Sequence, residues 1–229
     1  MTKDKISSGD ALKRLAEIGT GDVRNSFFSR FNAMGIHEDS LSEHHADIER
    51  IRLSPHVPTD VVMQFETARN LYLYAWYVYR FYPVAQHQAL TCVELGLREK
   101  LGSTIPASYL GRSKIPTMRP LLQYAIDSGL LRNEGFRRWR EHVLLRAQER
   151  YRDEQIAAMI DTEQMNCELR YENAVPNEQD RDFDYLEGMK IFLPHLRNSH
   201  AHGSTNLSKQ VLGTLELVQE ILDQLYEPT

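Results

Sequence analysis

Three of the nine histidines lie within eight positions, in the segment LPHLRNSHAHGS at residues 193–204. The same segment contains Arg197 and Asn198. An imidazole takes up and releases a proton near neutral pH, and a guanidinium is a permanent planar cation whose donors fit phosphate oxygens. We therefore interpret Arg197 and His202 as a candidate catalytic pair for phosphodiester cleavage. Asn198 is a neutral group that can orient the phosphate or the imidazole.

Cleavage of RNA by its own 2′-hydroxyl requires one proton carrier for that hydroxyl, one for the leaving 5′-oxygen, and a fixed cation for the charge on phosphorus. His202 supplies one proton carrier and Arg197 the cation. His200, only three residues from Arg197, either contacts the substrate or is a bystander. The non-catalytic alternative for Arg197 is an interaction with the last carbonyls of the preceding helix.

A metal site is a further alternative, with His195, His200 and His202 as nitrogen ligands. No Cys or carboxylate nearby completes a recognisable ligand set. We therefore predict no metal and no other cofactor.

The hexapeptide Arg197-Asn198-Ser199-His200-Ala201-His202 resembles the Arg-Asn-x-x-x-His motif of the HEPN superfamily (higher eukaryotes and prokaryotes nucleotide-binding). His202-Gly203 resembles a common ending of that motif, and residues 66–102 are similar to the early helical hairpin of bacterial members. The resemblance extends over roughly residues 60–226. It implies an up-and-down helical bundle, and a metal-independent endoribonuclease of the toxin or antiviral-defence type with Arg197, His202 and Asn198 in the site. Because some members have lost activity, a catalytically silent module that binds nucleotide or RNA, or that dimerises, is the alternative.

The resemblance also implies two kinds of partner. One is RNA, and the other is an antitoxin or defence protein. One HEPN subgroup has a Tyr two places after the motif His, which a partner nucleotidyltransferase modifies. Ser204 occupies that position here, so this antitoxin scheme is not expected. Since one Arg/His pair offers a single imidazole, we predict a homodimer in which two 193–204 segments face one another. Aromatic residues of 71–82 are candidates for part of the contact.

Two further places are candidates for supporting roles. Glu94 lies among apolar residues, where it can pair with Arg98 four residues on, or order the catalytic Arg as a supporting contact. Arg137 and Arg138 can bind RNA phosphate, with Trp139 stacking on a base. The alternative for this second segment is a core Trp139 on a helix with a solvated arginine face.

The elements that must position these residues are helical. Apolar residues recur at steps of three and four over roughly 60–82 and 85–101, with Pro83 between them, and again over 121–129, 134–169, 186–196 and 208–225. Almost no stretch alternates with period two. We therefore predict an all-α, HEPN-like helical bundle over residues 59–229, after a linker at 54–58.

Residues 1–53 are predicted to form a separate helical segment of unknown role. Ala11, Leu12, Leu15 and Ile18 suggest one helix that ends at Gly19. Val23, Phe27, Phe28 and Phe31 suggest a second that ends at Gly35.

Composition narrows the function class. The 229 residues carry a net charge of −5, which argues against nucleic-acid binding through the whole surface. The charge is segregated: residues 131–152 contain seven Arg and three Glu, and residues 153–187 contain eleven acids and two Arg. Neither a membrane span nor a secretory signal is evident, and Cys92 and Cys167 form no CxxC pattern. We predict a cytoplasmic protein with no membrane partner.

Overall fold

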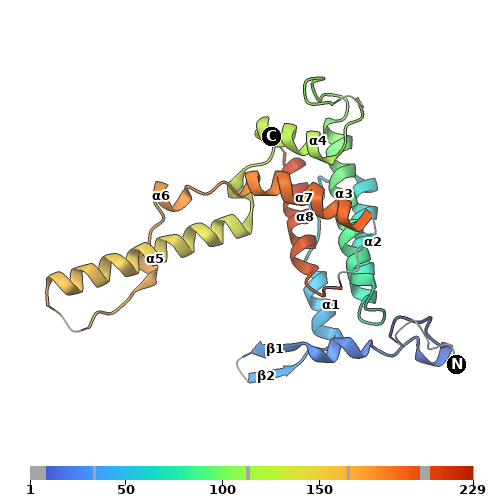
Figure 1. The fold of residues 1–229 in the computed structure, drawn as a ribbon, viewed down its shortest axis with the longest axis horizontal. Coiled ribbons are helices and arrows are strands. Elements are labelled where there is room, and N and C mark those ends of the chain that lie inside the picture. The colour runs from blue at the N-terminus through green and yellow to red at the C-terminus, as the bar shows by residue number, and fades with distance from the viewer. Residues whose placement is uncertain (1–8, 33–34, 112–113, 164–165, 202–206, 229) are drawn as a thin grey trace. The chain divides into compact units, whose positions relative to one another are not determined.

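The computed structural model describes residues 9–32, 35–111, 114–163, 166–201 and 207–228, which are mostly helical (Figure 1). This confirms the prediction of a mainly helical fold. The chain forms two compact units: unit 1 contains residues up to Leu130 and from Lys190 onward, and unit 2 contains Leu131–Met189. Both sides of the predicted linker at 54–58 belong to unit 1. Within the described ranges, no helix is long and apolar enough to cross a membrane.

The core of unit 1 forms where α3 (Phe81–Leu101) packs against α2 (Thr59–Tyr74) and α8 (Leu212–Leu225) (Figure 1). The apolar stripes predicted from the sequence are the buried faces, including Val61, Phe65, Ala68, Ala89, Leu90, Val93, Leu97, Leu215, Val218, Ile221 and Leu222. A Cβ on Gly96 would lie 2.5 Å from Cδ2 of Leu222. Glycine at this position lets α8 approach α3 closely.

The break between α2 and α3 lies before Pro83. α2 ends at Tyr74, and α3 begins at Phe81, so Pro83 is in the first turn of α3. A proline is tolerated there because the first N–H groups of a helix have no intrahelical acceptor. A proline between the two apolar stripes is compatible with one kinked helix or with two helices, and the structure has two.

The predicted N-terminal helices are wrong. Leu12, Leu15 and Ile18 are 98%, 87% and 58% exposed, so the first pattern has no buried face to stabilise a helix, and only a 3₁₀ turn forms at Leu15–Glu17. A second 3₁₀ turn at Val23–Phe27 is followed by an antiparallel hairpin of β1 (Ser29–Asn32) and β2 (Gly35–Glu38). Gly35 has a φ of +117°, a conformation that suits glycine in a chain reversal.

Contacts distant in sequence hold this hairpin and the helix that follows it, α1 (Leu41–Glu49). Arg30 on β1 pairs with Asp39 and with Asp47 of α1, and Asp39 also pairs with Lys209. Burial alone would raise the pKa of Asp39, but hydrogen bonds from Lys209 and Arg30 outweigh it and lower that pKa. These ion pairs stabilise the hairpin rather than the helix that the apolar pattern of residues 23–31 predicts.

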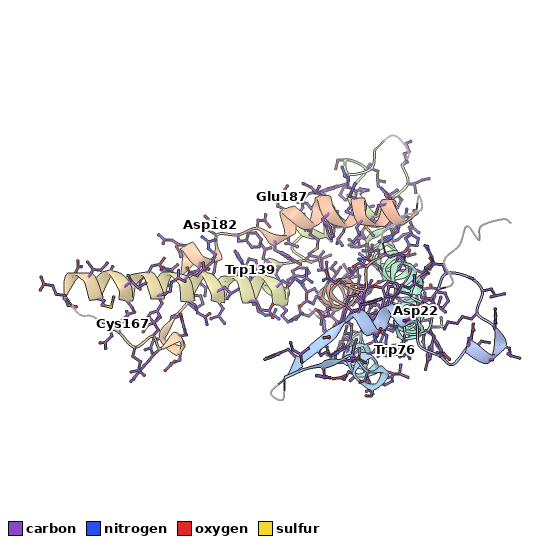
Figure 2. All side chains as sticks on the ribbon, turned by 60° about the horizontal axis from the view of Figure 1, so that its bottom comes forward. Asp22, Trp76, Trp139, Cys167, Asp182 and Glu187 are labelled. Carbon is purple, nitrogen blue, oxygen red and sulfur yellow. The ribbon has the colours of Figure 1, made fainter. Side chains whose placement is uncertain are left out.

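The N-terminal segment is fastened to the turn between α2 and α3. The carbonyl of Trp76 accepts hydrogen bonds from the backbone N–H of Asp22 at 2.8 Å and from Nδ2 of Asn25 at 2.7 Å. Figure 2 shows Asp22 and Trp76 beside each other. His44 of α1 is fully buried here, stacked on Tyr72 at 4.4 Å between ring centroids.

Of the 71–82 aromatics, Tyr72, Tyr79 and Tyr82 are buried within unit 1. Tyr74 is 55% exposed. Only the exposed part of this set is free to contribute to a contact with another chain.

α4 and the end of α7 complete unit 1. α4 (Met118–Asp127) forms where a helix was predicted over 121–129, but it begins earlier and ends at Asp127. Gly129, which follows it, has a φ of +73°. α7 (Tyr185–Ala201) contains Pro194, which has no N–H to donate to the carbonyl of Lys190, where the division between the units falls. α8 begins at Leu212, later than the predicted start at residue 208.

Unit 2 contains the long helix α5 (Arg137–Asp161) and the short helix α6 (Glu178–Arg181) (Figure 1). Arg150 of α5 pairs with Asp180 of α6 at 2.9 Å, and Arg146 donates to the carbonyl of Asp182 at 3.1 Å. The hydrogen bond from Arg150 lowers the pKa of Asp180. The acidic stretch thus folds back on the arginine-rich helix that precedes it.

Candidate functional site

Arg197 lies near the end of α7, and its guanidinium is directed to α3. Its Nη2 lies 3.1 Å from Oε2 of Glu94, and the Arg197 side chain is 33% exposed. This contact differs from the alternative in which Arg197 would bind the last carbonyls of its own helix. The motif arginine is therefore held by a carboxylate from a helix that is distant in the sequence.

Glu94 has two cationic partners. It is only 8% exposed, and its other oxygen, Oε1, accepts from Nη2 of Arg98 at 2.7 Å. Both predicted contacts, the i,i+4 pair with Arg98 and the contact with the motif arginine, are present together. Two guanidiniums compensate the buried carboxylate, which would be costly alone.

His200 is fixed by a chain of side chains from three helices. Its Nε2 lies 2.8 Å from Oε1 of Gln86 on α3, and Nε2 of that glutamine donates to Oγ1 of Thr214 on α8 at 2.8 Å. With the Gln86 amide oriented in this way, Nε2 of His200 carries the proton and Nδ1 is the acceptor of the neutral ring. Burial lowers the pKa of His200, and the neighbouring His87 lowers it further.

His87 of α3 joins this group, although it was not among the site residues predicted from the sequence. Its ring centroid lies 6.3 Å from that of His200. Burial lowers the pKa of His87, and the charge of Arg197 lowers it further. The available signal was its spacing: His87 precedes Glu94 by seven residues, which places both on one face of α3.

Two predicted residues at the motif remain to be placed. Asn198 is exposed, and its Oδ1 accepts from Nη1 of Arg197 at 3.4 Å. His202, the predicted proton carrier, and Ser204 lie outside the described residues. His195 is exposed on α7.

One of the predicted RNA contacts in unit 2, the stacking of Trp139 on a base, is wrong. This side chain is 6% exposed, and its Nε1 donates to the carbonyl of Phe183 at 2.8 Å, so its ring is packed inside unit 2 rather than presented to a base. Arg137 pairs with Glu141 at 3.1 Å, and Arg138 is exposed. The core alternative for Trp139 is the one that the structure shows.

Across the described ranges, no three His, Cys, Asp or Glu residues are placed to hold a metal ion. The site that the structure does define is a half-buried cluster in unit 1. It consists of one ion pair, Glu94 with Arg197, and two imidazoles, those of His87 and His200. A fixed cation beside two neutral imidazoles can bind an anion and move protons around it.

Comparison with known proteins gives no match: no family model, no curated protein and no solved structure is significantly similar to this chain.

Proposed function

We propose that the protein is a metal-independent endoribonuclease of HEPN type, with its site at Arg197. The observation that supports this proposal best is the contact of 3.1 Å between Arg197 and the buried Glu94, with His200 one turn further along α7. A guanidinium held by a carboxylate is preorganised to meet a phosphate, so it need not be ordered when the substrate binds.

In the proposed reaction, the 2′-oxygen of the substrate forms a bond to phosphorus while the bond from phosphorus to the 5′-oxygen breaks. A histidine of the motif takes the 2′-hydroxyl proton, and Arg197 stabilises the charge on the phosphoryl oxygens. The products are a 2′,3′-cyclic phosphate and a 5′-hydroxyl. DNA is not a substrate because it lacks the attacking hydroxyl.

The test is incubation of the purified protein with mixed RNA in EDTA, with end-group analysis of the fragments. We expect Arg197→Ala to abolish cleavage without a change in circular dichroism or melting, and a loss of cleavage in His202→Ala would assign a proton transfer to His202. Arg119→Ala, which removes an exposed arginine of α4 in the same unit, is the matched control and should remain active. Full activity of Arg197→Ala, or loss of cleavage in EDTA alone, would contradict the proposal.

The catalytically silent binding module is the other outcome of this experiment. It predicts intact RNA together with binding that weakens in Arg197→Ala. Host growth on induction of the wild type and of Arg197→Ala distinguishes the two as well, because only a ribonuclease of the toxin type would make the wild type more harmful. The homodimer, RNA as a partner and an antitoxin or defence partner stay predictions.

A further inference from the structure

Two helices bring two imidazoles to one guanidinium. His87 precedes Glu94 by two turns of α3, and His200 follows Arg197 by one turn of α7, so each ring belongs to the helix face that carries one member of the ion pair. The ring planes are inclined by 55° with centroids 6.3 Å apart. At this separation each ring can place a nitrogen within hydrogen-bonding reach of the same phosphodiester.

The two rings differ in their surroundings. With Oε1 of Gln86 as the acceptor, Nε2 of His200 carries the proton, which leaves the lone pair of Nδ1 to accept a second one. Nδ1 of His87 is buried without a hydrogen-bond partner among the described residues, as is Nε of Arg197. Buried polar atoms nearly always have a partner, so two such atoms on neighbouring side chains indicate a place for a ligand that accepts hydrogen bonds.

A phosphodiester has the chemistry that these atoms lack. A phosphate oxygen accepts from Nε–H of Arg197, and it accepts from His87 once that ring is protonated. Its negative charge also offsets the Arg197 charge that contributes to lowering the pKa of His87 in the free protein. Binding of the substrate therefore favours uptake of a proton by His87.

We propose that His87 is the second proton-transferring residue of the Arg197 site, supplied by the same protomer, and that it protonates the leaving 5′-oxygen. This rests on the proposed function and assigns the acid that the reaction needs. His200, in place of the predicted His202, takes the proton of the 2′-hydroxyl as the new bond to phosphorus forms. His87 gives its proton to the 5′-oxygen as the old bond breaks, and the two imidazoles then exchange protons with water.

The proposal changes what is expected of a dimer. If the second imidazole came from a two-fold partner, mixing wild type with excess His202→Ala subunits would reduce activity as the square of the wild-type fraction. With both imidazoles in one protomer, mixing wild type with His87→Gln subunits should reduce activity linearly, once subunit exchange has been confirmed. A quadratic fall would overturn the assignment to one protomer.

The role as acid is tested with two substrates, an RNA dinucleotide and uridine 3′-(4-nitrophenyl phosphate). The nitrophenolate leaves without a proton, so only the dinucleotide needs an acid. We expect His87→Gln to slow dinucleotide cleavage by about 100-fold or more, and nitrophenyl ester cleavage by less than about threefold. The control is His195→Gln, which replaces an exposed histidine on the same helix as Arg197 and should change neither rate. Equal losses on both substrates, or no loss on the dinucleotide, would overturn the proposal.

A binding measurement separates this proposal from the proposed function. The ring signal of His87, identified by its absence in His87→Gln, is titrated by NMR with and without inorganic phosphate. The groups of α7 that act on it are Arg197, which pairs with Glu94, and the ring of His200, and we expect phosphate to raise the pKa of His87. No rise would remove His87 from the site. A rise in a wild type that cleaves no RNA would instead refute the ribonuclease and leave His87 in an anion-binding site.

Discussion

The buried carboxylate of Glu94 joins the guanidiniums of Arg98 and Arg197, at 2.7 Å and 3.1 Å, and so links two turns of α3 with the end of α7. One oxygen serves each arginine. The pairing with Arg197 restricts the motif arginine to one orientation, whereas the pairing with Arg98 lies within α3.

Glu94→Gln should therefore reduce RNA cleavage by about 10–150-fold, the range that corresponds to the loss of a charge-assisted hydrogen bond of about 1.5–3 kcal/mol. Arg98→Gln is the matched control, because it leaves the contact between Glu94 and Arg197 in place, and it should stay within about twofold of the wild type. The measurement is kcat/KM on an RNA dinucleotide. Equal effects of the two substitutions would show that Glu94 supports α3 rather than Arg197.

His44 should make stability depend on pH. Burial lowers its folded-state pKa below the ordinary value of 6.5, although a hydrogen bond to the Tyr72 carbonyl opposes the shift. Between those two pKa values the unfolded chain binds a proton that the folded chain does not. The contribution of His44 is therefore complete above about pH 6.5 and is lost as the pH falls through the folded pKa.

The check is urea unfolding from pH 7.5 down to pH 5 in the wild type and in His44→Phe, which keeps an aromatic ring but does not titrate. The wild type should lose more stability than the variant over this range. His87 and His200 also have lowered pKa values, so the difference between the two proteins, and not the wild-type slope alone, reports on His44. Parallel curves would contradict the assignment.

Gly96 should be sensitive to a single methyl group. In most helix interiors Gly→Ala stabilises by about 1 kcal/mol, but here the new Cβ would lie 2.5 Å from the buried Leu222, and overpacking costs about 1–3 kcal/mol. We expect Gly96→Ala to destabilise the wild type and to stabilise a Leu222→Ala background. Gly188→Ala of α7, where nothing lies within 4 Å of the added Cβ, should stabilise both. Chemical denaturation of the six proteins, namely the two backgrounds alone and with each glycine substitution, measures the signs.

Trp139→Phe tests the interior of unit 2. It removes the donor to the Phe183 carbonyl, at a cost of about 0.5–1.5 kcal/mol plus any loss of packing. RNA affinity should be unchanged because the ring is buried. A selective loss of RNA affinity at unchanged stability would return Trp139 to the list of RNA contacts.

Helices whose apolar residues recur every three or four positions were predicted well. The apolar stripes of α2, α3 and α8 could be seen in the sequence because each is long and ends in a buried face. The stripe at residues 23–31 has the same period, yet Arg30 finds acidic partners at Asp39 and Asp47 and the chain forms a hairpin. The local apolar pattern carries no information about these ion pairs with residues further along the chain, so it could not predict the hairpin.

The candidate site shows the same limit. Arg197 and His200 lie in one short segment, so their residue types and spacing identify them as candidates from the sequence alone. His87 lies more than a hundred residues earlier, in an otherwise ordinary stretch of helix. Only the packing of α7 near α3 brings its ring close to that of His200. Glu94 was found because a carboxylate within an apolar stripe requires compensation.

The division of unit 1 into two stretches of chain has a consequence for synthesis on the ribosome. The chain segment of unit 2 is made between α3 and α8, so its contacts can all form before α8 exists. At about 5–20 residues per second, roughly 6–25 s separate the end of α3 from the end of α8. For that time the face of α3 around Gly96 has no helix to cover it, and a nascent chain halted between residues 190 and 211 should bind a chaperone that the completed chain does not.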